Sequence, residues 1–182
     1  MDWNSIEILP WFWKPSHSFS FTLVAILVLP ALFAYILAFA TFRKRVGGVY
    51  FAIITQALAL ALSILVIGQQ GYTGGSNGIT DFKTILGLDL YSENAKTVLY
   101  YLTVFLLLVA ILVSRIIINS RFGKVLVAIR DQEDRVRFSG YNTYLFKAFI
   151  FAVAAIFSAL GGVIYTLQVG LISPSFIGIV PS

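Results

Sequence analysis

The sequence predicts an all-α, polytopic membrane protein with four transmembrane helices and a short cytoplasmic helix. Of its 182 residues, 59% are hydrophobic and 12% are charged, whereas a soluble domain has about 45–50% apolar and about 25% charged residues. Four apolar stretches approach or exceed the roughly 20 residues that a helix needs to cross a bilayer. These spans and their connections use nearly all of the length, so residues 1–182 are predicted to form a single membrane region without a soluble catalytic domain.

The first span is predicted at about 19–42, a stretch that contains no charged residue. The aromatic cluster Pro10–Trp13 precedes it and is typical of the headgroup level of a bilayer. Arg43-Lys44-Arg45 ends the span. The second apolar stretch, at about 49–67, follows after a very short connection.

Small and polar residues recur along one face of the second span and again along the fourth. The members that offer hydrogen bonds or close approach are Thr55, Gln56 and Ser63 in the second span and Ser158 and Gly162 in the fourth. Such stripes mostly serve close helix packing, and they should face protein rather than lipid. A polar path for a solute is the other interpretation, and the sequence leaves both open.

A Gly-rich polar connection, residues 68–96, separates the second span from the third. Its Thr73–Gly78 segment predicts tight turns; it resembles a phosphate-binding loop only superficially, because no strand precedes it and no lysine follows at the required place. The third span is predicted at about 97–118. The fourth is predicted at about 148–172, where Ser173-Pro174 should end the helix.

The connection 119–147 is the most charged part of the chain, and its beginning predicts a short amphipathic helix. Val125, Ile129 and Val136 share one face. Asp131 with Arg135 and Glu133 with Arg137 are acid–base pairs four residues apart, which favours a helix, and Gly140 suits a left-handed cap. This helix is a candidate for docking its apolar ridge into a soluble partner. The alternative is a solvated connector.

The distribution of charge predicts how the chain lies in the membrane. Most basic residues fall on one side of the four-span arrangement: Arg43, Lys44, Arg45, Arg115, Arg121, Lys124, Arg130, Arg135, Arg137 and Lys147. Basic connections face the cytoplasm, so both termini of this segment and the Gly-rich connection are predicted outside. Membrane-flanking basic residues are explained in this way without a nucleic-acid partner.

Several chemistries are disfavoured by what the sequence lacks. It has no cysteine and a single histidine, His17, without an acidic neighbour, so no metal or catalytic site is predicted. No Asp, Glu, Lys or His lies within the depth of a span, which disfavours ion-coupled transport. There is no ATP-binding P-loop, so any ATP hydrolysis requires another chain.

Several motifs together resemble one known family. The segments Gly48–Leu58 and Gly74–Lys83, followed by the charged helix, are similar to the LivM-like permeases of ABC importers. Three further segments resemble, more narrowly, the second permease subunit of urea ABC transporters, in the same order: Pro10–Trp13, Val127–Asn142, and Gln168–Gly170 with Ser173–Ser175.

This resemblance implies a function and a set of partners. The region from Arg121 to Tyr141 corresponds to the segment that couples the permease to ATPase subunits, which bind ATP and Mg; the chain itself would hold no cofactor. The residues expected to carry this coupling are Arg121, Gly123, Val125, Ala128, Ile129, Arg130, Asp131, Arg135, Val136, Phe138 and Gly140. A second permease subunit and a periplasmic solute-binding protein would complete a transporter of urea or a similar small amide in the bacterial inner membrane.

Other functions remain open at this point. The alternatives are a branched-chain amino acid or short-amide permease, and a non-transporting scaffold whose charged helix binds anionic lipid or a structural partner. Members of the family are about twice as long, so the resemblance also implies that these 182 residues are an excerpt or a truncated form of a longer permease.

Overall fold

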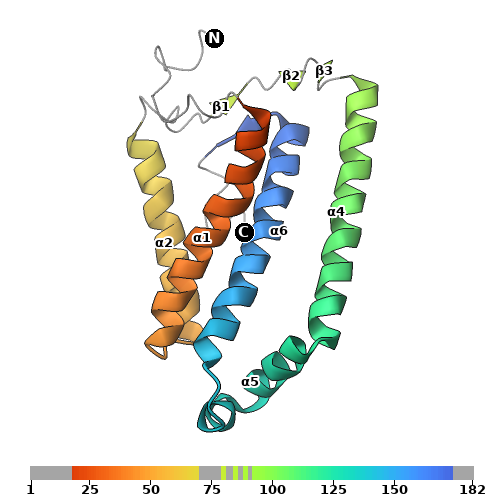
Figure 1. The fold of residues 1–182 in the computed structure, drawn as a ribbon. Coiled ribbons are helices and arrows are strands. Elements are labelled where there is room, and N and C mark those ends of the chain that lie inside the picture. Colours follow the sequence, from red (N-terminus) through yellow and green to blue (C-terminus); the bar gives the residue numbers. More distant parts are fainter. Residues whose placement is uncertain (1–17, 70–78, 81–83, 86–87, 90–91, 174–182) are drawn as a thin grey trace. The chain divides into compact units, whose positions relative to one another are not determined.

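The computed structural model describes residues 18–69, 79–80, 84–85, 88–89 and 92–173. The described part is dominated by helices (Figure 1): α1 (Phe19–Arg43), α2 (Val49–Gly68), α4 (Glu93–Asn119), α5 (Arg121–Phe138) and α6 (Thr143–Val169). Short strands β1 (Ile79–Thr80), β2 (Thr84–Ile85), β3 (Leu88–Asp89) and β4 (Leu171–Ile172) complete it. Helices α1, α2, α4 and α6 are long and apolar enough to cross a membrane, which confirms the predicted all-α, polytopic class.

The third and fourth spans begin earlier than predicted. Helix α4 starts at Glu93 rather than 97, because the Ser92 side chain caps it by accepting a hydrogen bond from the Ala95 N–H at 3.2 Å. Helix α6 starts at Thr143 rather than 148. The apolar stretches of α4 and α6 thus predicted the part of each helix that suits lipid. At its N-terminal end, each of these two helices extends further, into a segment that includes polar residues.

The predicted end of the fourth span is wrong. Helix α6 ends at Val169, not at Ser173-Pro174, because Gly170 takes a left-handed backbone conformation with φ 72°. Glycine adopts this conformation without the steric cost that a Cβ would bring. The chain then continues as β4, so the residues before the proline are extended rather than helical.

The chain divides into two compact units, which are described separately. The first comprises residues 1–23, 48–99 and 163–182, and the second comprises residues 24–47 and 100–162. The single membrane region proposed from sequence, which concerns the chain as a whole, stays a prediction.

In the first unit, two short strand pairs form near the ends of the helices. Strand β1 pairs antiparallel with β4, with Ile79 opposite Ile172 and Thr80 opposite Leu171. The connection that follows α2 is therefore joined to the chain that follows α6. Strands β2 and β3 form the other pair. The predicted turns of Thr73–Gly78 and the aromatic cluster Pro10–Trp13 lie outside the described residues.

In the second unit, the end of α1 packs against the beginning of α6. The rings of Phe39 and Tyr144 meet edge to face with centroids 5.5 Å apart. Ala38 and Ala148 are fully buried, and such small side chains allow close approach of helices. Arg43 at the end of α1 and the first turns of α6 therefore lie at the same end of this unit, which brings the two basic connections together.

Candidate functional site

Helix α5 joins α4 to α6, and its junction with α4 is closely packed. Ser120 caps α5: its Oγ accepts a hydrogen bond from the Gly123 N–H at 3.1 Å and donates one to the Ile117 carbonyl at 2.6 Å. A Cβ at Gly123 would lie 2.2 Å from the Ile117 carbonyl oxygen and 2.4 Å from that of Ile118. Only glycine fits there, so the chain turns from α4 into α5 without a flexible linker.

The helix is interrupted at Gln132, whose backbone has φ −152° and ψ 83°. It therefore consists of a first part, residues 121–131, and a second part, residues 133–138, and the ribbon changes direction between them (Figure 1). The predicted short helix is present, and the structure adds a break at this point. No glycine or proline marks the break in the sequence, so local propensity could not have revealed it.

The apolar ridge of α5 faces the interior of its own chain. Ile129 is only 5% exposed, and Val125 and Val136 are half-buried. Ile129 is thus covered by the chain itself, and docking of this ridge into a partner stays a prediction. The opposite face of α5 is the one open to solvent.

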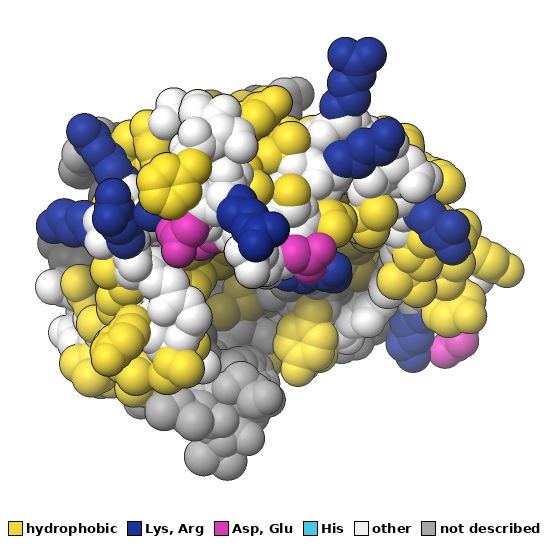
Figure 2. All heavy atoms as spheres, turned by 90° about the horizontal axis from the view of Figure 1, so that it is seen from below, with side chains coloured by type: hydrophobic (Ala, Val, Ile, Leu, Met, Phe, Trp, Pro, Cys, Tyr) yellow, Lys and Arg dark blue, Asp and Glu magenta, His cyan; other side chains and the backbone are white. Residues whose placement is uncertain are grey.

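That opposite face, called here the outer face of α5, is basic and also carries exposed apolar side chains. Phe138 is 91% exposed and Val127 is 43% exposed. The other exposed residues of α5 and its cap are Arg121, Lys124, Ala128, Arg130, Asp131, Gln132, Asp134, Arg135, Ser139 and Gly140. Figure 2 shows dark blue Lys and Arg side chains spread over the end of the molecule on which α5 lies. The predicted Asp131–Arg135 pair is replaced by a contact of Asp131 with its neighbour Arg130 at 3.0 Å.

The second predicted ion pair of α5 is confirmed and is part of a larger network. Arg137 donates to Glu133 Oε1 at 3.1 Å, Thr143 Oγ1 donates to the same oxygen at 3.0 Å, and Lys147 Nζ donates to Oε2 at 2.5 Å. Partial burial by itself would raise the pKa of the Glu133 carboxyl. The hydrogen bonds from Lys147 and Thr143 and the positive charges of Lys147 and Arg137 outweigh it and lower that pKa below its ordinary value.

Gly140 ends α5 in the predicted left-handed conformation, with φ 88°. The Gly140 N–H donates to the Arg137 carbonyl at 3.0 Å, and the Tyr141 N–H donates to the Val136 carbonyl at 3.4 Å. This pair of bonds forms a Schellman cap. The chain is thereby directed into α6 within a few residues.

Aromatic side chains fill the space between α5 and α6. The Phe122 ring stacks on Phe146 at 5.0 Å and meets the edge of Phe149 at 5.2 Å. Tyr141, in the connection between the two helices, meets the edge of Phe146 with ring centroids 6.2 Å apart. These aromatic contacts were not predicted from the sequence, although Phe146 and Phe149 are three residues apart and therefore share one face of α6.

The small and polar residues predicted for packing or a solute path belong to both units and are described one by one. Thr55 Oγ1 donates to the carbonyl of Ala52 in its own helix at 2.9 Å, Gln56 is exposed, and Ser63 is buried. On α6, Ser158 and Gly162 are exposed. Whether these residues serve packing or a solute path stays a prediction.

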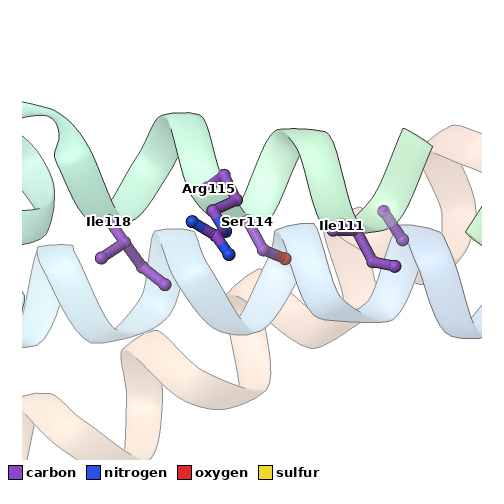
Figure 3. Close-up of a pocket in the computed structure, with 5 residues that line it drawn as sticks. Ile111, Ser114, Arg115 and Ile118 are labelled. Carbon is purple, nitrogen blue, oxygen red and sulfur yellow. The ribbon is translucent and has the colours of Figure 1, made fainter. Parts of the chain in front are cut away.

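A shallow pocket of about 290 Å³ lies along α4 and is lined by Ala110, Ile111, Ser114, Arg115 and Ile118. In Figure 3 the labelled side chains of Ile111, Ser114, Arg115 and Ile118 project to one side of the helix. The lining is mostly apolar, and none of the predicted solute-path residues contributes to it. This pocket therefore does not mark the predicted path.

Comparison with known proteins identifies the family. Residues 4–180 match the family described as "Branched-chain amino acid transport system / permease component". The chain belongs to this family. No solved structure matches it significantly.

Two curated relatives match most of the chain. It is 25% identical over 169 residues to the high-affinity branched-chain amino acid transport system permease protein LivM of Escherichia coli (strain K12), covering 81% of this chain and 39% of that protein. The protein of the same name from Salmonella typhimurium (strain LT2) is 25% identical over 162 residues, covering 77% of this chain and 38% of the relative. The chain thus spans about two-fifths of the length of these relatives.

Proposed function

We propose that this chain is a permease subunit, in whole or part, of an ABC importer in the bacterial inner membrane that translocates urea or a similar small amide. The observation that carries the proposal is α5, held between two membrane spans with a basic outer face and an exposed Phe138. A helix placed in this way can receive the movement of a soluble subunit and pass it to the spans. Family membership supports the same role.

The proposed partners would supply ATP hydrolysis and solute delivery to this permease. ATPase subunits would bind ATP and Mg and contact α5 from the cytoplasm, and a periplasmic binding protein would deliver the solute. A second permease subunit would complete the path. In this arrangement the basic connections face the cytoplasm, as the positive-inside rule requires, and the termini of this segment lie outside.

The uncharged spans favour a neutral solute. Residues 97–114 of α4 and 148–169 of α6 contain no charged side chain, and α2 contains none. Urea needs hydrogen bonds rather than counter-charges. A branched-chain amino acid, the solute class named for the two relatives, carries two opposite charges whose desolvation must be compensated. A branched-chain amino acid is therefore the second candidate solute, and the names of the two relatives favour it.

Uptake by the assembled complex separates the two solutes. The full-length permease with its ATPases and binding protein, reconstituted in liposomes, is expected to take up labelled urea in an ATP-dependent manner. Labelled leucine serves as the comparison. Uptake of leucine without uptake of urea would establish the amino acid alternative.

Docking through the outer face of α5 is tested with Phe138. Because this side chain is 91% exposed, Phe138→Asp should leave the stability of the permease unchanged while reducing ATPase co-purification at least several-fold. Phe138→Leu, which keeps an apolar side chain, is the matched control and should retain binding. Wild-type ATPase recovery with Phe138→Asp would remove the docking role from this face. A wild-type permease that binds no ATPase at all would instead favour the scaffold.

A further inference from the structure

The side chain of Glu133 joins the second part of α5 to the first turns of α6. One carboxylate oxygen accepts a hydrogen bond from Thr143, the first residue of α6, and the other accepts one from Lys147, one turn later. Both oxygens are thus held by the same helix. Charge-assisted hydrogen bonds of this kind are directional and stronger than neutral ones, so the contact fixes the position of residue 133 along α6.

The contact is partly shielded from solvent. Thr143 is only 2% exposed, and the side chains of Lys147 and Glu133 are 26% and 33% exposed. The carboxylate also lies at the N-terminal end of α6, where the helix dipole favours a negative charge. Its pKa is lowered further below neutral, so the carboxylate is ionised at pH 7.

The same lysine connects the network to a third helix. Lys147 Nζ lies 5.4 Å from the centroid of the Phe42 ring, in the last turn of α1. The neighbouring Phe39–Tyr144 contact also joins α1 to α6. A displacement of Glu133 would therefore act on the ends of two membrane spans.

The first part of α5 is attached to α6 in a different way. Phe122 touches α6 through ring contacts with Phe146 and Phe149, and such contacts are weaker than charge-assisted hydrogen bonds. The break at Gln132 interrupts the helix between the two parts. Movement of the first part of α5 can therefore be lost at this break unless the second part is held to α6.

We propose that Glu133 is a positioning residue that clamps the second part of α5 to α6, so that movement imposed on α5 is transmitted to α6 and α1 instead of being absorbed at Gln132. This inference rests on the proposed function, because it assigns the residue through which the coupling acts. Glu133 was recognised in the sequence only as half of an ion pair within one helix.

The test compares two carboxylates that are adjacent in the sequence. Glu133→Gln removes the charge of the clamp. Asp134→Asn is the matched control, because Asp134 is 84% exposed and its ion pair is with Arg137 of the same helix, at 3.6 Å. In the complete complex, Glu133→Gln should retain ATPase binding but transport several-fold less solute per ATP hydrolysed, and Asp134→Asn should match the wild type. Lys147→Met should cause less loss when added to Glu133→Gln than when made in the wild type, because the Glu133–Lys147 contact is already weakened.

A second measurement follows the clamp directly. The 182 residues contain no cysteine, so spin labels can be attached through Ser139→Cys in the cap of α5 and Leu145→Cys in α6. Their distance distribution should stay narrow on ATP binding in the wild-type background and broaden with Glu133→Gln. A Lys124→Cys and Leu145→Cys pair, which reports the first part of α5, should change on ATP binding in the wild-type background.

The outcomes separate this inference from the proposed function. A Glu133→Gln permease that transports like Asp134→Asn, or whose Ser139–Leu145 distances remain narrow, would overturn the clamp. Loss of ATPase binding with Glu133→Gln would place the residue in the docking surface and also overturn it. A wild-type permease that neither binds ATPases nor transports would instead refute the proposed function.

Discussion

Replacement of Gly123 by alanine should disrupt the junction between α4 and α5. The added Cβ would lie 2.2 Å from the Ile117 carbonyl oxygen and 2.7 Å from the Ile118 carbonyl carbon. Both are backbone atoms, so no side chain can rotate away to make room. The turn itself must open, and this would separate the Gly123 N–H from the Ser120 cap.

The cost can be estimated from these two effects. Loss of a serine N-cap typically destabilises by about 1 kcal/mol, and overpacking a closely packed site costs about 1–3 kcal/mol. The sum is roughly 2–4 kcal/mol, a difference of several degrees in Tm for a chain of this length. Thermal unfolding in detergent, followed by circular dichroism, would measure it.

Gly161→Ala provides the matched control for this change. Gly161 also lies inside a helix, but a Cβ there would meet nothing within 4 Å. Because alanine has a higher helix propensity than glycine by about 1 kcal/mol, this variant should be as stable as the wild type or more so. Equal stability of the Gly123→Ala and Gly161→Ala variants would refute the close approach described for the junction.

Three further perturbations test other parts of the second unit. Ion pairing lowers the pKa of Glu133. The stability that the Glu133 contacts contribute should therefore be complete above the pKa of an unfolded glutamate, about 4.3, and lost as the pH falls through the lower pKa of the folded protein. The Tm difference between the wild type and Glu133→Gln should shrink in acid, and a difference that grew would contradict this. Ile129→Ala should cost about 2–4 kcal/mol, since the side chain is 5% exposed, and an unchanged Tm would show that the apolar ridge is not buried. Ser120→Ala should lose about 1 kcal/mol through the N-cap, and Ser120→Asp, which retains an acceptor, should recover most of it.

The membrane-spanning helices were predictable because lipid acts on each helix locally. A span must be apolar over its whole length whatever it packs against, so hydropathy found the four that the described residues contain. It missed the earlier starts of α4 and α6 and placed the end of α6 too late. Gly140 was predictable for a related reason. The left-handed cap at the end of α5 depends on the glycine itself, and the structure confirms it.

The charged connection was predicted less well, because its details depend on residues far apart in the sequence. The apolar spacing correctly indicated an amphipathic helix, but it could not tell whether Ile129 faces a partner or its own chain. The break at Gln132 has no marker in the sequence. Glu133 was expected to pair with Arg137 four residues away, and that pair exists, yet two of its contacts come from α6, ten and fourteen residues away.

The sequence by itself determined the four spans, the amphipathic character of the segment between α4 and α6, the basic nature of one side and the family resemblance. Each of these features depends on composition or on the spacing of residues along a single helix. Only the tertiary structure decided which face of α5 is free, where it breaks, and that Glu133 ties it to α6. The physical reason is that burial and charge pairing arise between helices, and α5, unlike a membrane span, is not shaped by a uniform apolar solvent.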